Sequence, residues 1–89
     1  MFKVTNVWDG DSFEVTPKWS SNGNSGNGVR LADYNAPEKG QPGYEGSKRK
    51  LEGMILGKLV ELKKPRATDK FGRLVCDVFV DGKQILMAA

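Results

Sequence analysis

Five short segments of the chain have the residue pattern of β-strands, and one has helical spacing, which limits the folds open to 89 residues. The strand-like segments lie at residues 2–8, 12–17, 29–34, 59–64 and 73–80. One face of the helical segment consists of Ser47, Leu51, Met54 and Ile55, and Gly57 is a stop signal. The order β-β-β-α-β-β predicts a mainly β fold, a five-stranded OB-fold barrel with the helix plugging one end.

The connections between the first segments give more detailed expectations. Asp9-Gly10 is a tight-turn dipeptide, so the first two strands should form a hairpin. The second strand is expected to stop at Pro17, since proline cannot donate to a sheet. Residues 18–28, rich in Gly, Ser and Asn, are expected to form a mobile loop that serves as a surface hairpin connection, and Trp19 is expected to fold back over the barrel end.

The composition excludes several kinds of active site. The chain has no histidine, which rules out Ser-His-Asp and Cys-His hydrolases as well as His/Cys zinc sites. Cys76 is the single cysteine, and we expect it to be a small buried side chain. No apolar run approaches the roughly 20 residues of a membrane span, and the N-terminus lacks the apolar region of a signal peptide. We therefore expect no membrane partner.

Charge is distributed unevenly along the chain. The net charge is +3, but residues 1–38 carry three basic and five acidic side chains, whereas residues 39–73 carry ten basic and four acidic ones. An acidic first part followed by a basic middle suits a metal pocket beside a track for a polyanion. The alternative is a solvated helix face whose lysines serve solubility.

Polar side chains that suit a metal ion and a phosphate lie near the predicted strand ends. Asp11, Asn35 and Glu38 carry oxygens that could converge on Ca²⁺, which takes six to eight oxygen ligands. Arg30 and Arg73 open the third and fifth strands, and paired guanidinium groups match phosphate oxygens. Either arginine could equally be an ordinary edge charge.

Three motifs in order, "VWDGDSFEV", "VRLADYNAPE" and "TDKFGRLVCDVFVDGK", make the chain resemble the staphylococcal nuclease (thermonuclease) family over nearly its whole length. The resemblance implies that Arg30 and Arg73 clamp the phosphate and stabilise the transition state. It implies that Glu38 is the general base for the attacking water. Family members cut DNA and RNA at the 5′ side of the phosphodiester and leave 3′-phosphates.

The resemblance also implies a Ca²⁺ cofactor and a substrate contact. Asp11 corresponds to the first Ca²⁺ carboxylate, and Ala36 would lend its backbone carbonyl. Asn35 stands where the family usually has a second carboxylate, so weaker Ca²⁺ binding is expected. Lys70 and Phe71 stand where the family has a substrate-contacting lysine and tyrosine, but Phe71 lacks the hydroxyl group.

Length is a second departure from the family. Residues 84–89 are expected to begin a helix, whereas the family's nucleases continue with two further helices that pack on the barrel. We expect a single domain of residues 1–89, either a minimal barrel or a copy truncated at its C-terminus. A barrel without its covering helices should expose apolar surface, which favours a homodimer or a domain swap.

Two functions remain open from the sequence. The first is a Ca²⁺-dependent endonuclease that hydrolyses DNA or RNA, with single-stranded nucleic acid as the expected partner. The second is a catalytically weak or inactive module of the same fold that binds nucleic acid or protein without cutting, as in Tudor staphylococcal nuclease proteins. The Arg30, Glu38 and Arg73 set favours the enzyme, and Asn35 and the short chain favour the binding module.

Overall fold

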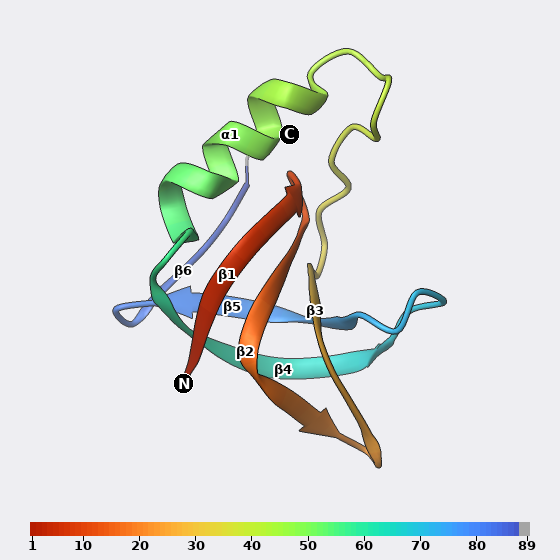
Figure 1. Cartoon of the computed structure of the whole chain (residues 1–89), viewed down its shortest axis with the longest axis vertical. Helices are drawn as coiled ribbons and strands as arrows, with labels where there is room; N and C mark the ends of the chain where they lie inside the picture. The colour runs from red at the N-terminus through yellow and green to blue at the C-terminus, as the bar shows by residue number, and fades with distance from the viewer. Residues whose placement is uncertain (88–89) are drawn as a thin grey trace.

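The strands of the computed structural model, which describes residues 1–87, curl into a closed barrel with a helix across one end (Figure 1). The elements are β1 (Phe2–Asp9), β2 (Ser12–Ser21), β3 (Asn24–Leu31), α1 (Tyr44–Ile55), β4 (Leu59–Thr68), β5 (Leu74–Val80) and β6 (Lys83–Gln84). The predicted order β-β-β-α-β-β is therefore confirmed, and β6 is a two-residue addition to it.

One parallel pairing closes the barrel. The strands are hydrogen-bonded in the order β3-β2-β1-β4-β5-β6, and each of these neighbours is antiparallel. β3 also pairs with β5 in parallel, with Val29 opposite Leu74 and Leu31 opposite Cys76. The result is a five-stranded mixed barrel with one helix in the described part of the chain, an architecture compatible with an OB-fold.

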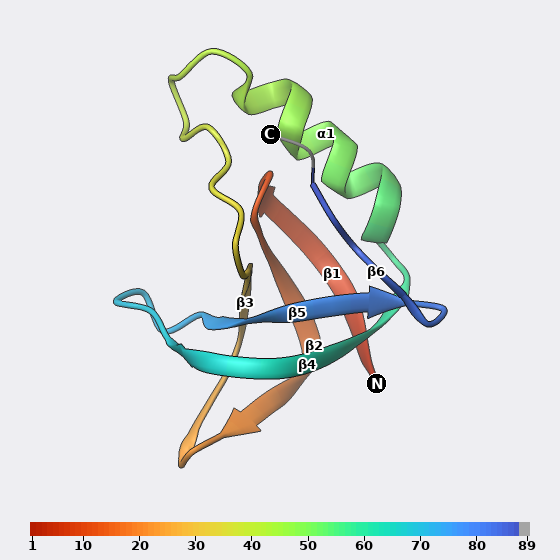
Figure 2. The same ribbon diagram turned by 180° about the vertical axis from the view of Figure 1, so that it is seen from behind.

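Alternating strand residues and one helix face fill the barrel. The buried apolar residues are Val4, Val7, Phe13, Val15, Trp19, Val29, Leu31, Leu51, Ile55, Val60, Leu74, Cys76 and Val78. Leu51 and Ile55 of α1 are fully buried, so the predicted apolar stripe does close the barrel end (Figure 2). The helix stops where expected, because Gly57 adopts a left-handed φ of 77° just after its end. None of residues 1–87 belongs to a helix long and apolar enough to cross a membrane.

The expected hairpin connection at residues 18–28 is confirmed and Trp19 is buried, but the prediction that this segment is a loop is wrong. β2 continues through Pro17 to Ser21, and β3 begins at Asn24, so the two strands form a longer hairpin that turns at Asn22 and Gly23. A register shift between Glu14 and Trp19 lets the proline sit where a sheet donor is not needed. Trp19 is buried opposite Gly26, and its Nε1 donates to the Gly28 carbonyl at 2.7 Å. Burial of this indole therefore orders a segment whose composition suggests disorder.

Two strand boundaries also differ from expectation. β3 ends at Leu31 rather than at residue 34, and Asp33 has a left-handed φ of 61°. β4 runs on to Thr68 across Pro65, because the pairing with β5 contains an irregularity between Lys63 and Ala67.

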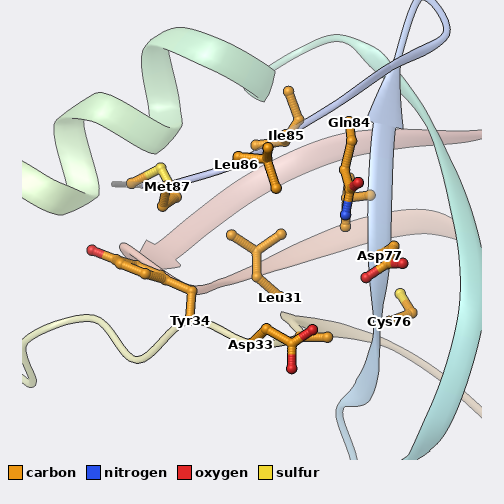
Figure 3. A pocket seen from close by; sticks show the side chains of 11 residues that line it. Leu31, Asp33, Tyr34, Cys76, Asp77, Gln84, Ile85, Leu86 and Met87 are labelled. Atoms are coloured by element: carbon orange, nitrogen blue, oxygen red, sulfur yellow. The ribbon is translucent and has the colours of Figure 1, made fainter. Parts of the chain in front are cut away.

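The predicted helix at residues 84–89 is wrong where the structure describes it. Gln84 belongs to β6, and the Ile85 N–H donates to the Val78 carbonyl at 2.8 Å, which extends the pairing with β5. Residues 85–87 have no regular structure and lie over a cavity of ≈ 80 Å³ beside the end of β3, where Ile85 and Met87 pack on the core (Figure 3). Residues 88–89 lie outside the described part.

Apolar side chains are exposed at several places within residues 1–87. The large ones are Met1, Trp8, Leu56, Leu59, Phe71 and Leu86. They come from both ends of the barrel and from the turn after β4, so exposure is not confined to one face. A homodimer or domain swap stays a prediction.

We predict that Leu51→Ala lowers the free energy of unfolding by about 2–5 kcal/mol, because it empties part of the barrel plug. Urea denaturation followed by circular dichroism measures the change. The exposed neighbour Lys50→Ala should alter stability by less than about 0.5 kcal/mol. Equal effects of the two substitutions would contradict the plugging role of α1.

Candidate functional site

One cavity of ≈ 510 Å³ gathers most of the residues that the sequence singles out. It lies where the β1–β2 turn, the end of β3 and the β4–β5 turn meet. Its lining consists of Asp9, Asp11, Arg30, Asn35, Ala36, Glu38, Phe71 and Arg73. Lys70 is the one candidate outside the lining, and its Nζ lies 5.1 Å from the centre of the Phe71 ring.

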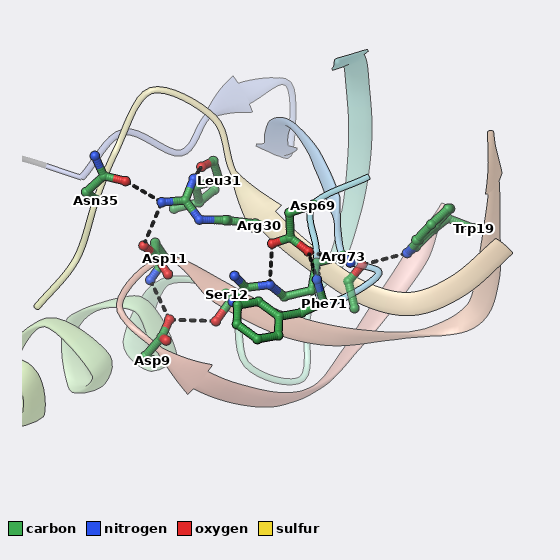
Figure 4. Close-up of polar contacts among 11 residues, drawn as sticks. Asp9, Asp11, Ser12, Trp19, Arg30, Leu31, Asn35, Asp69, Phe71 and Arg73 are labelled. Carbon is green, nitrogen blue, oxygen red and sulfur yellow. Dashed lines mark hydrogen bonds and ion pairs between the residues drawn. The ribbon is translucent and has the colours of Figure 1, made fainter. Parts of the chain in front are cut away.

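Asp11 is the centre of the polar contacts in this cavity (Figure 4). Its Oδ2 accepts a hydrogen bond from Arg30 Nη2 at 3.3 Å and another from the Ala36 N–H at 3.0 Å. The same Arg30 nitrogen also donates to Asn35 Oδ1. The Arg30 guanidinium therefore bridges the two side-chain oxygens that the sequence assigns to a metal ion.

Asp9 belongs to the site, although its sequence context predicts only a turn residue. Its Oδ1 accepts the Ser12 hydroxyl at 2.6 Å and the Asp11 N–H at 3.1 Å. Burial opposes ionisation of Asp9, but hydrogen bonds from Asp11 and Ser12 and the charge of Arg73 lower its pKa. The spacing of two aspartates around one glycine was the signal in the sequence that could have identified it.

Asp11 shifts in the opposite direction. Burial, then the hydrogen bond and charge of Asp9, raise the pKa of Asp11 from 3.8 to about 6, against the Ala36 N–H and Arg30, which lower it. The two carboxyl groups are close enough to titrate as a pair. Near pH 5, the Asp11 side chain beside Arg30 therefore carries less negative charge than an exposed aspartate would.

Arg73 is fixed by a residue that the sequence analysis also missed. Asp69 Oδ2 accepts Arg73 Nε at 2.7 Å, while its Oδ1 accepts the Phe71 and Arg73 N–H groups at 2.9 and 3.0 Å. These bonds, led by the Arg73 N–H, lower the pKa of Asp69 despite its partial burial. The Asp-x-x-Gly turn was the available signal, because aspartate often accepts the N–H two residues ahead.

Gly10 lets three segments meet behind the cavity. A Cβ at this position would lie 2.4 Å from Ser47 Oγ of α1 and 2.9 Å from the Ala36 Cβ. The β1–β2 turn can therefore approach both the helix and the loop after β3 only with glycine here. The tight turn is expected from the sequence, but this close approach is not.

Glu38 lies at the exposed end of the same loop. Its N–H donates to Gln41 Oε1 at 2.7 Å, which shapes the chain beyond Pro37. The side chain is solvent-exposed and lines the cavity that holds the two arginines. The structure thus brings Arg30, Glu38 and Arg73 together from β3, the loop after it and the residue just before β5.

The oxygen ligands near Asp11 are of the types that bind a hard cation, although together they carry little negative charge. Asp11, Asn35 and the Ala36 carbonyl offer one carboxylate, one amide and one peptide oxygen, all of which Ca²⁺ accepts. Among residues 1–87 no three His, Cys, Asp or Glu side chains are grouped to hold a metal ion. The Arg30 guanidinium already contacts the Asp11 and Asn35 oxygens, so a cation would compete with it.

No family model matches the chain, and no curated protein matches it.

We predict that Asp11 of the metal-free protein titrates with a pKa of about 6 and that Asp9→Asn moves this pKa toward 3.8. The folded state then binds a proton more tightly at Asp11 than the unfolded chain does. This contribution makes stability fall as pH rises from about 4 to 6. The lowered pKa of Asp9 has the opposite effect, at lower pH.

Carboxyl ¹³C NMR measures the pKa of Asp11 in the natural chain and in the Asp9→Asn variant. Urea unfolding at several pH values measures the free energy of unfolding. Glu14→Gln, on the part of β2 outside the cavity, is the matched control and should leave Asp11 unchanged. An Asp11 pKa at or below its ordinary value in the natural chain would contradict this electrostatic description.

Proposed function

We propose that this chain is a phosphodiesterase of the staphylococcal nuclease type that hydrolyses DNA or RNA. The observation that carries the proposal is a single cavity that holds Arg30, Glu38 and Arg73. Two guanidinium groups and one exposed carboxylate are the groups that phosphodiester hydrolysis needs. The second and third motifs of the family resemblance contain these three residues.

The arginines bind the phosphate and stabilise the charge that develops on it. Asp69 engages Nε of Arg73, and no hydrogen bond to Nη1 or Nη2 of Arg73 occurs within residues 1–87. Those terminal nitrogens are available to phosphate oxygens. The Arg30 side chain extends into the cavity from β3, and the hydrogen bond from its Nη2 to Asp11 holds the guanidinium group in place. Guanidinium groups stay charged at any working pH, which suits them to binding a phosphate.

Glu38 acts as general base. Its exposed carboxylate removes a proton from a water molecule, whose oxygen attacks phosphorus. The bond from phosphorus to the 5′ oxygen breaks, and the leaving oxygen takes up a proton from solvent. The products are a 3′-phosphate and a 5′-hydroxyl, as the family resemblance implies. The basic residues of the middle of the chain attract the polyanion to this cavity.

Ca²⁺ is the proposed cofactor, held by Asp11, Asn35 and the Ala36 carbonyl. When bound, it would act as a Lewis acid on the phosphate and help to position water. Its binding should be weak, because Asn35 replaces a charged ligand and because Arg30 contacts the same oxygens.

One observation favours a second function, binding without cleavage. Arg30 already donates hydrogen bonds to the Asp11 and Asn35 oxygens. Its positive charge therefore balances the Asp11 carboxylate without a metal ion. A cavity of this kind can hold a phosphate between two arginines and release it unchanged.

We predict Ca²⁺-dependent cleavage of single-stranded DNA that Glu38→Gln reduces by about 10²–10⁴-fold, the usual contribution of a general base. Gel analysis with Ca²⁺ and with chelator measures the rate and identifies the terminal phosphate. Glu45→Gln, an exposed carboxylate on α1 outside the cavity, is the matched control and should cleave normally. Salt-dependent binding without cleavage would support the binding module instead.

A separate prediction concerns the amide. Asn35→Asp should bind Ca²⁺ more tightly than the natural chain, because it adds a carboxylate to the ligand set. Isothermal titration with Ca²⁺ measures this directly and does not depend on cleavage. Asp33→Asn, which alters a nearby exposed carboxylate outside the cavity, should leave the affinity nearly unchanged. Equal affinities of the Asn35→Asp variant and the natural chain would defeat this assignment of the metal ligands.

A further inference from the structure

A second cavity of ≈ 500 Å³ adjoins the first. It is lined by Trp8, Asn27, Gly28, Phe71, Gly72 and Arg73, and so shares Phe71 and Arg73 with the cavity described above. Its volume falls within the roughly 300–1,000 Å³ of small-molecule sites. A ligand that binds Arg73 in the first cavity can therefore extend into the second cavity.

Two exposed aromatic side chains line this second cavity. Phe71 is 70% exposed and Trp8 is 38% exposed, whereas the other tryptophan, Trp19, is only 2% exposed. Single exposed apolar residues are common on small proteins. Here the two rings belong to one cavity and lie next to a cation, since the Arg73 guanidinium is 5.1 Å from the centre of the Phe71 ring.

Gly28 sets the position of the Trp8 indole. A Cβ at Gly28 would lie 3.1 Å from two Trp8 ring atoms and 3.0 Å from Arg73 Cγ. Because Gly28 has no side chain, the Trp8 indole and the aliphatic part of Arg73 can both pack against β3 at this position. The Tyr44 hydroxyl donates to the Trp8 carbonyl at 3.0 Å, which ties this part of β1 to the start of α1.

We propose that the cavity between Trp8 and Phe71 is a stacking site for one unpaired base of a single-stranded nucleic acid, next to the phosphate held by Arg73. The proposal rests on the function proposed above and adds to its expected single-stranded partner a site for one base, with Trp8 as a contacting residue. Every base has a face that stacks on an aromatic ring, so the contact tolerates any sequence. Bases of an intact duplex are stacked on one another, so this site selects single strands.

The test measures binding with cleavage suppressed. A Glu38→Gln background in chelator is titrated against a fluorescein-labelled single-stranded oligodeoxythymidylate and against an oligomer of equal length and charge whose internal residues are abasic. Trp8→Ala should weaken binding of the base-bearing strand by about 5- to 100-fold and leave binding of the abasic strand unchanged. Trp8→Phe keeps a ring and should lose only a few-fold.

Leu59→Ala is the matched control, because Leu59 is also exposed and apolar but lines a different cavity with Met1 and Val80. It should bind both strands like the parent. A readout that needs no variant is the NMR signal of the Trp8 indole N–H, which should shift with the base-bearing strand and not with the abasic one. That signal keeps the proposal testable if Trp8→Ala fails to fold.

The outcomes separate this proposal from the proposed function. Equal weakening of both strands by Trp8→Ala, or an indole signal that ignores the base, overturns the stacking site while cleavage by the natural chain stands. If the parent binds neither strand and the natural chain cleaves nothing, both proposals fail together.

Discussion

Asp11 accepts hydrogen bonds from Arg30 of β3 and from Ala36 in the loop after it, and the shape of the cavity depends on these two contacts. They hold the irregular segment after β3 against the β1–β2 turn, where Gly10 permits the close approach. The side chains of Asp11 and Arg30 are only 10% and 22% exposed, so loss of one partner leaves a poorly solvated charge. The ion pair is therefore part of the fold as well as of the site.

The same contact gives the site its electrostatic character. Arg30 lies between Asp11 and Asn35, and any added cation has to share or replace it, whereas an added phosphate is attracted to it. Burial, then the hydrogen bond and charge of Asp9, raise the pKa of Asp11, so this carboxyl group contributes less negative charge to the cavity than an exposed aspartate would. On our account an amide at position 35 keeps the cavity balanced toward anion binding and weakens its hold on metal.

The barrel could be predicted from the sequence because alternating apolar residues and a helical stripe are local patterns. The failures are also instructive. The composition of residues 18–28 favours a mobile hairpin connection with Trp19 folded back on the barrel, yet burial of Trp19 against Gly26 makes most of this segment regular strand. The candidate residues of the site follow from motifs, but the bridge from Arg30 to Asn35 does not, because it depends on where β3 ends and how the next loop turns.

The central claim is that Arg30 and Arg73 face one phosphate. It is tested most directly by ¹⁵N NMR of the arginine side chains in the Glu38→Gln protein, titrated with a dinucleoside monophosphate that has a single phosphodiester. The account predicts that the guanidinium signals of both arginines shift together and saturate at the same concentration, while those of Arg66, which is paired with Asp77 at 2.9 Å, stay in place. A shift at one arginine alone, or at neither, would contradict it.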